Sequence, residues 1–396
     1  MNKINTGLRL RIAWLFFGMM FFFGIEQLFL NKIIRDSSTR GYLTIAYVVA
    51  LVIFDIPTGI LADRISRKLC LLLASFVQIA ALIILGTSTT LPIYILGSFV
   101  FGIFICLING AAQAVLYDWL ALTNQTKKYA KEQGRNYAAF LIGAGIANIF
   151  SGFIANSFGL RSNYFLSIIP AILAFFVLLK LVDPPFAKKV ETDWYKHLGE
   201  VVREVTRHRK VIVFSVQLVA SGVAFYTVGE FGQIYMLAFG ISTVALGLFW
   251  AIDAVFAAGG RFLAHSFQTY PRLLIITFCF VIFIFALIER KIGIGVFWLF
   301  YGLNEAISNV AETEIQHETS SHIRATTLSV VSFAGNLIAI PIILLYTHYY
   351  LRHGIFAANK LIIIALVIVL LATLLVRPSK VSQAEDQPLT SMPPAI

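Results

Sequence analysis

The chain has 396 residues, of which 59% are hydrophobic and 13% charged, with a formal net charge of +11 and a mean hydropathy of +0.83. These values exclude an ordinary soluble domain and a disordered chain, and they are typical of a protein that crosses a membrane many times. Because Cys70, Cys106 and Cys279 all lie within apolar runs, the sequence argues against a disulfide framework.

The first apolar run, from about Ile12 to Leu30, follows a basic N-terminus, as in a signal peptide. It is long enough to cross a bilayer and lacks a small-residue cleavage site, so we expect a retained first helix. With roughly 20 apolar residues for each crossing, the chain predicts twelve spans. They are expected near residues 12–31, 41–62, 69–88, 92–117, 136–157, 162–182, 211–238, 243–264, 272–289, 293–311, 325–347 and 355–376.

The basic residues predict the orientation of these spans. An even number of crossings places both termini on one side, and 23 of the 31 Lys and Arg residues fall on that side. Since cytoplasmic loops carry the excess of basic residues, we expect a multi-pass cell membrane protein with cytoplasmic termini. The same loops account for the positive net charge, which therefore does not indicate a nucleic-acid partner.

The loop after the second span carries a cluster of charged residues in the run DIPTGILADRISRK. Its glycine, Gly59, allows a neighbouring helix to approach closely. Asp63 can accept hydrogen bonds from the N-terminus of another helix. The following cations can pair with a carboxylate, and they are Arg64, Arg67 and Lys68.

This run resembles the loop signature of the major facilitator superfamily of transporters, Gly-x-Leu-x-Asp-Arg-x-Gly-Arg-Arg/Lys, with Ser66 in place of the second glycine. The resemblance implies an all-α membrane fold of two pseudo-symmetric six-helix halves, which face each other across a central cavity. It also implies that Asp63 meets the eleventh span near Arg324 and that Asp118, at the end of the fourth span, is the partner carboxylate. These residues would form a cytoplasmic gate. Asp55, two turns before it, is expected to stabilise either the kink at Pro57 or the gate itself.

The two halves are predicted at residues 1–182 and 211–376. Between them, residues 183–210 form a polar cytoplasmic linker in which apolar residues recur at helical spacing. We expect either an amphipathic helix lying on the membrane lipids or a partly ordered linker. The tail at residues 377–396 is polar and proline-rich, and we expect it to be disordered.

Five carboxylates fall at membrane depth, where each costs at least a few kcal/mol and usually faces a cavity or a partner. They are Glu26, Asp55, Glu230, Asp253 and Glu305. In the resembled family the first, fourth, seventh and tenth spans line the cavity, which implies cavity positions for the three glutamates. We expect Glu26, Glu230, Asp253 and Glu305 to exchange protons or to bind a cationic substrate.

Deep basic partners are nearly absent from the predicted spans, apart from Arg261 toward the end of the eighth. A structural ion pair between Asp253 and Arg261 is the alternative to a functional Asp253. On the fourth span, Asn109 and Gln113 share a helix face at i, i+4 and are candidate substrate contacts, with helix packing as their alternative role.

Aromatic residues make up 14% of the chain, and many lie in mid-span. An aromatic, acidic cavity favours a lipophilic cation, through cation–π and Coulomb attraction. The shortage of deep Arg and Lys argues against phosphates and other anions, whereas sugars remain possible.

We therefore predict a secondary transporter that works by alternating access, with proton-coupled efflux of a small amphipathic or cationic compound. A proton-coupled uptake symporter for a sugar or other neutral solute is the alternative, followed by a lipid flippase or a non-transporting sensor. Exporters of the resembled family often carry an Arg on the fourth span and a Gly-Pro pair on the fifth. This chain lacks the first and has Ala147-Asn148 in place of the second, which weakens the case for export.

The sequence does not favour an enzyme. His317 and His322 are spaced i, i+5, so they do not share a helix face as the histidines of a zinc-protease helix do. We expect no metal and no cofactor. The expected partners are a small-molecule substrate, protons and membrane lipids, and the protein is expected to be monomeric.

Asp63→Asn is expected to slow turnover with little change in substrate affinity, because a gate closes the cavity without contacting its contents. Turnover in proteoliposomes, measured beside equilibrium binding of the same substrate, checks this. Wild-type turnover in the variant would remove the gate role from Asp63.

Overall fold

The computed structural model describes residues 4–34, 39–64, 66–125, 128–181, 199, 202–203, 205–319 and 324–376. In these ranges every regular element is a helix. The predicted N-terminal half contains α1 (Ile4–Gly18), η1 (Phe23–Ile25), α2 (Glu26–Phe29), η2 (Leu30–Ile34), α3 (Thr39–Arg64), α4 (Arg67–Thr87), α5 (Leu91–Leu122), α6 (Tyr129–Phe158) and α7 (Leu160–Leu179). The predicted C-terminal half contains α9 (Arg209–Ala224), η4 (Phe225–Gly229), α10 (Gly232–Ala238), α11 (Thr243–Phe267), α12 (Pro271–Leu287), α13 (Gly293–Glu318) and α14 (Arg324–Leu375).

Each of the twelve predicted spans overlaps one or more of these helices. Eight helical segments in the described ranges are long and apolar enough to cross a membrane, and one of these lies within α14 and carries two predicted spans. The chain reverses inside α14 at Gly354, whose φ of 82° and ψ of 169° suit a residue without a Cβ.

Two spans are interrupted helices. The first span consists of α1, η1, α2 and η2, and the seventh consists of α9, η4 and α10. Such breaks free backbone groups from the regular helical pattern, and at membrane depth these groups must find partners within the protein. Both breaks lie beside the cavity described below.

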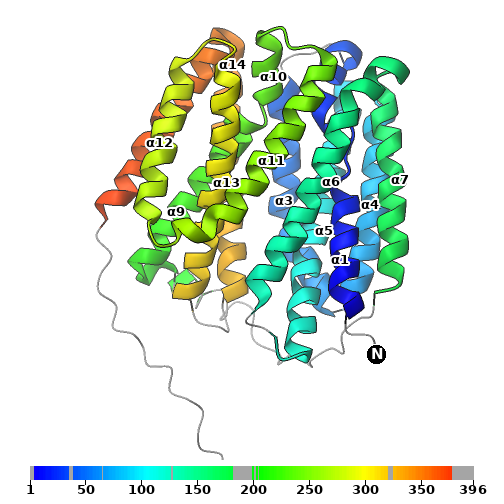
Figure 1. Ribbon diagram of the computed structural model, residues 1–396, viewed down its shortest axis with the longest axis vertical. Coiled ribbons are helices and arrows are strands. Elements are labelled where there is room, and N and C mark those ends of the chain that lie inside the picture. Colours follow the sequence, from blue (N-terminus) through cyan, green and yellow to red (C-terminus); the bar gives the residue numbers. More distant parts are fainter. Residues whose placement is uncertain are drawn as a thin grey trace, which may run out of the picture.

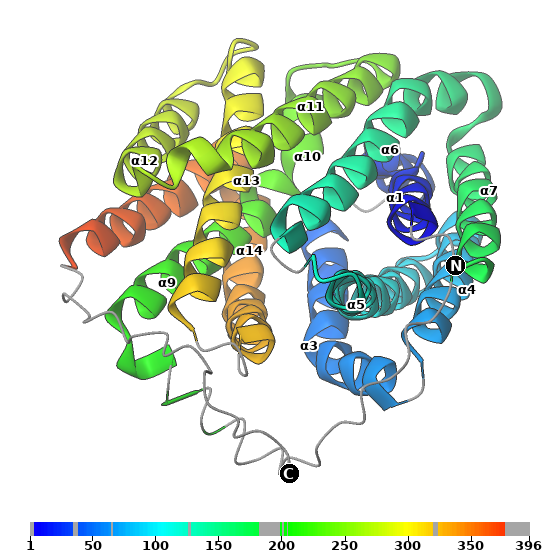
Figure 2. The same ribbon diagram turned by 60° about the horizontal axis from the view of Figure 1, so that its bottom comes forward.

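The two halves stand side by side, and both ends of the described chain lie at the same end of the bundle, the lower end in Figure 1. We call this the terminal end and the other the far end. Figure 2 turns the terminal end toward the viewer. In this view, α3, α5 and α6 of one half face α11, α13 and α14 of the other. The helix pairs with the most extensive contact between the halves are α6 with α11 and α3 with α14.

Glycines bring α6 and α11 into backbone contact near the far end. A Cβ on Gly152 would lie 2.4 Å from the carbonyl oxygen of Thr243, and a Cβ on Gly247 would lie 2.5 Å from that of Asn148. Small residues permit this approach, as is usual where helices pack inside a membrane. The far end is therefore where the halves fit most tightly along this helix pair.

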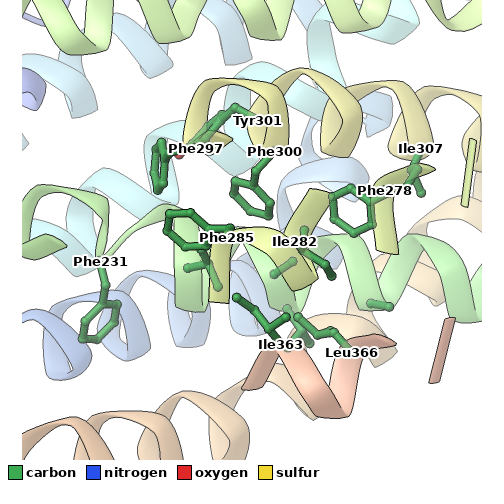
Figure 3. Packing of buried hydrophobic residues seen from close by; sticks show 14 of the residues in the cluster. Phe231, Phe278, Ile282, Phe285, Phe297, Phe300, Tyr301, Ile307, Ile363 and Leu366 are labelled. Carbon is green, nitrogen blue, oxygen red and sulfur yellow. The ribbon is translucent and has the colours of Figure 1, made fainter. Parts of the chain in front are cut away.

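Each half has its own apolar interior, which holds the cavity-lining helices in place. In the C-terminal half, Phe297 of α13 packs against Phe285 and Phe300, with ring centroids 5.8 and 5.7 Å away. Figure 3 shows these three rings together in the apolar interior. Tyr301 continues this cluster toward the cavity, with its ring centroid 5.4 Å from that of Phe297. Close packing of this kind fixes the rotamers of the side chains that it surrounds.

The linker predicted at residues 183–210 lies largely outside the described ranges, and the tail at residues 377–396 lies wholly outside them.

Gly152→Ala is expected to lower the stability of the purified protein by about 1–3 kcal/mol, because the new methyl group would meet backbone atoms rather than a movable side chain. Thermal denaturation in detergent measures the effect. Gly145→Ala is the matched control, since a Cβ there would lie 3.7 Å from the nearest atom, the Cβ of Ala254. Equal denaturation midpoints for the two variants would contradict the close contact.

Candidate functional site

A cavity of about 420 Å³ lies between the two halves. This volume is within the range of small-molecule sites. Four of the candidate carboxylates line it, namely Glu26, Glu230, Asp253 and Glu305. Most of the remaining lining is apolar, and its aromatic members include Phe23, Tyr47, Tyr137, Phe225, Trp250 and Tyr301.

Arg40 joins the halves at the far side of the cavity. It lies at the start of α3 and is 3% exposed. Its Nη1 donates to Oε2 of Glu26 in the same half, and its Nη2 donates to Oε2 of Glu230 in the other half. The hydroxyl of Tyr94 donates to the second oxygen of Glu26 at 2.7 Å, and the hydroxyl of Tyr164 lies 2.8 Å from that of Tyr94.

The expectation that deep basic partners are nearly absent is therefore wrong. In the sequence, Arg40 lies at the edge of an apolar run, where a loop residue and the first residue of a helix look alike. Since α3 begins at Thr39, Arg40 is already part of the helix, and its side chain is buried between the halves. Glu26 and Glu230 fall at similar depths in their spans, and this was the signal in the sequence that could have indicated a buried cation between them.

Two glutamines that the sequence analysis did not single out add to this cross-half contact. The backbone N–H of Gln27 donates to Oε1 of Gln233 at 2.7 Å, and Nε2 of Gln233 donates to the carbonyl oxygen of Phe23 at 2.5 Å. Phe23 lies at the break between α1 and α2, so the interruption of the first span supplies an acceptor for the partner half.

A second ion-pair cluster lies nearer the terminal end. Nε of Arg261 donates to Oε2 of Glu305 at 2.6 Å, and Nη1 of Arg261 lies 3.7 Å from Oε2 of Glu312. The guanidinium carbon stacks 4.0 Å from the ring centroid of Tyr137, which comes from α6 of the other half. The alternative in which Arg261 pairs with Asp253 is wrong, because Arg261 lies two turns further along α11 and reaches α13 instead.

Asp253 differs from the other carboxylates of the cavity. It is 4% exposed, and its Oδ1 has no hydrogen-bond partner. Among the described residues, no ion pair involves it. Nε1 of Trp250, one turn earlier on α11, is likewise buried without a partner. Buried polar groups are rarely left in this state, so both atoms are free to meet water or a ligand that enters the cavity.

The predicted gate residues are only partly described. Nη1 of Arg67 donates to Oδ2 of Asp118, the carboxylate that the resemblance implied, and Nζ of Lys68 donates to the carbonyl oxygen of Leu179 at 2.8 Å. These bonds tie α4 to α5 and to the end of α7. The surroundings of Gly59 and the side chains of Asp63 and Arg64 lie outside the described part of the structure, so the gate role of these residues stays a prediction.

Of the three further candidates, only Asp55 has a described side chain. Asp55 lies on α3 but not in the cavity lining, and the hydroxyl of Thr58 donates to its carbonyl oxygen at 3.2 Å beside Pro57. The side chains of Asn109 and Gln113 lie outside the described part of the structure, and their role stays a prediction.

Residues 12–343 match the Major Facilitator Superfamily. The chain belongs to this superfamily. Members of this superfamily are multi-pass membrane transporters of small molecules, and they are not enzymes.

Curated relatives match part of the chain. An uncharacterised transporter, BU466, of Buchnera aphidicola is 27% identical over 60% of this chain and 54% of its own length. Multidrug resistance protein 2 of Bacillus subtilis is 26% identical over 41% of this chain and 40% of its own length. The chain thus spans about half the length of the curated relatives that it matches.

Solved transporter structures match nearly the whole chain. The nucleoside transporter NupG is similar with a TM-score of 0.74 at 14% identity, covering 94% of this chain and 99% of that one. A D-xylose–proton symporter is similar with a TM-score of 0.70 at 14% identity, covering 92% and 97%. These likenesses confirm the predicted all-α fold of the Major Facilitator Superfamily.

Arg261→Gln is expected to destabilise the transporter by roughly 1–3 kcal/mol, because it leaves the largely buried carboxylate of Glu305 without its cation. Thermal denaturation in detergent measures this. Lys360→Gln is the control, since it breaks the more exposed pair with Glu289 and is expected to cost only about 0–1 kcal/mol. Similar losses in both variants would show that the Arg261–Glu305 pair contributes no more to stability than an exposed pair does.

Proposed function

We propose that this transporter exports a small amphipathic cation in exchange for protons. The observation that carries the proposal is Asp253, a buried carboxylate with a free oxygen in an aromatic cavity. An unpaired carboxylate is costly in such surroundings, and a proton or a cation relieves the cost. A cationic substrate can therefore be bound at Asp253, which the exchange requires.

The charges of the cavity support a cationic substrate. Glu26 and Glu230 share one guanidinium, Glu305 is paired with Arg261, and Asp253 has no cation of its own. The faces of Trp250 and Tyr301 can add cation–π attraction beside Asp253. Phosphates and other anions would meet repulsion, because both guanidinium groups are already engaged by carboxylates.

The distribution of contacts between the halves supports a state that opens toward the termini. The cross-half hydrogen bonds of Arg40, Gln27 and Gln233 and the closest approach of α6 and α11 all lie toward the far end. With cytoplasmic termini, as the basic residues predict, Asp253 would meet a substrate that arrives from the cytoplasm. The Arg67–Asp118 pair and Asp63 would then close this side when the transporter faces outward.

A second candidate is proton-coupled uptake of a neutral solute. Asn148 lines the cavity, and its Oδ1 is buried without a partner. An amide at this place can bind a hydroxyl group, and it stands where the sequence lacks the Gly-Pro pair of many exporters. The relative named as a multidrug resistance protein is what favours export over this alternative.

Asp253→Asn is expected to lower the transport of a fluorescent lipophilic cation by roughly tenfold or more, since a charged contact is worth about 1.5–3 kcal/mol. Everted vesicles with a preformed pH gradient report cation movement and proton release together. Glu305→Gln is expected to abolish gradient-driven transport as well, because it removes the other carboxylate nearest to Asp253.

Glu289→Gln is the matched carboxylate control, because Glu289 pairs with Lys360 outside the cavity and should leave transport unchanged. Wild-type transport in both Asp253→Asn and Glu305→Gln would overturn the assignment. Accumulation of a neutral solute in energised intact cells, without any cation-dependent proton release, would establish uptake in its place.

A further inference from the structure

The ion pairs of Arg40 leave one negative charge without a cation. Glu26 and Glu230 both bind this guanidinium, and the side chains of the three residues are only 11%, 16% and 4% exposed. Two carboxylates and one guanidinium sum to one excess negative charge. We call Glu26, Arg40 and Glu230 the far-end cluster.

Burying an excess charge is expensive, and two carboxylates that share one site do not both stay ionised readily. One proton would make the far-end cluster neutral. Glu230 belongs to the C-terminal half, whereas Glu26 and Arg40 belong to the N-terminal half. The far-end cluster is therefore complete only when the far end is closed. Closure of the far end therefore favours the binding of one proton, and a bound proton favours closure, because the proton makes the closed cluster neutral.

The hydrogen bonds indicate which carboxyl group holds the proton. Glu26 accepts from both Arg40 and Tyr94, and Tyr94 is supported in turn by Tyr164. In the described structure, Arg40 is the one side chain that donates to Glu230. Protonation of Glu230 therefore disrupts fewer hydrogen bonds to a carboxylate than protonation of Glu26 would.

No further cation faces Glu230 from the described elements around it. The titratable groups within electrostatic range are the phenols of Tyr47 on α3, Tyr226 beside it in η4 and Tyr301 on α13, together with Glu26. Neutral phenols can donate hydrogen bonds but cannot balance a charge. Gln27 and Gln233, which join the halves nearby, are neutral as well.

We propose that the far-end cluster takes up one proton, held by Glu230, each time the far end closes, and that this is the proton exchanged for substrate. Water on the far side would supply the proton while the cluster is apart. A cationic substrate in the cavity would replace it as the balancing charge, and the proton would leave through the cavity, which Glu230 lines. The inference rests on the proposed exchange function and assigns its proton to a group other than Asp253.

Distance measurements between spin labels on the two halves test the proposal without a substrate. Phe158→Cys, at the end of α6, and Ile292→Cys, before α13, place labels at the far end on residues that are each 72% exposed. Cys70, Cys106 and Cys279 are buried and protected from labelling. In lipid nanodiscs, the labelled but otherwise wild-type protein is expected to shift to the short distance as the pH falls.

Glu230→Gln and Glu26→Gln each remove the excess charge and leave Arg40 with one carboxylate. Both variants are expected to keep the short distance at every pH, whereas Glu289→Gln should respond as the wild type does. The proposal is overturned if the wild-type distance does not change with pH, if acid lengthens it, or if both glutamine variants keep the wild-type response. The wild-type titration alone decides the matter if a variant fails to fold.

Proton-coupled export is tested separately by cation-dependent proton release from everted vesicles. Proton release with no effect of pH on the far-end distance would remove the far-end cluster as the coupling site and leave the exchange function intact. A pH-dependent distance without any cation-dependent proton release would remove the exchange function instead.

Discussion

Few basic side chains inside the membrane are available to pair with the carboxylates there, and the rest of the structure depends on this shortage. A charge at this depth must be paired, hydrated through a cavity or neutralised by a proton. Arg40 and Arg261 each bind carboxylates from another helix, and each also contacts the opposite half. These two guanidiniums therefore hold the bundle together, and they also determine which acidic groups are left for a substrate.

The two guanidinium clusters divide the cavity along its length. Arg40 joins the halves at the far end with two ion pairs, while Arg261 reaches the other half nearer the terminal end through the ring of Tyr137. An ion pair across the halves depends strongly on protonation, whereas a stacked ring does not. The far end is thus the side at which pH can act directly on the fit between the halves.

Asp253 lies between these clusters without a partner of its own, on a helix whose far end is held against α6 by glycine contacts. Close packing of α11 fixes the position of this carboxylate relative to Trp250 and Tyr301. A substrate can then be bound by rigid aromatic faces and one charge, which favours recognition by shape and charge over recognition by many specific hydrogen bonds.

The sequence by itself determined the twelve spans, the family and the candidate acids, because apolar run length, loop charge and the run DIPTGILADRISRK are all local in the chain. Only the tertiary structure decided which acids are paired. Arg40 lies 190 positions from Glu230, and Arg261 pairs with Glu305 rather than with Asp253 on its own helix. Such pairings follow from helix rotation and from the contact between the halves, which no local pattern encodes, so the free carboxylate of Asp253 could be found only once the helices were placed.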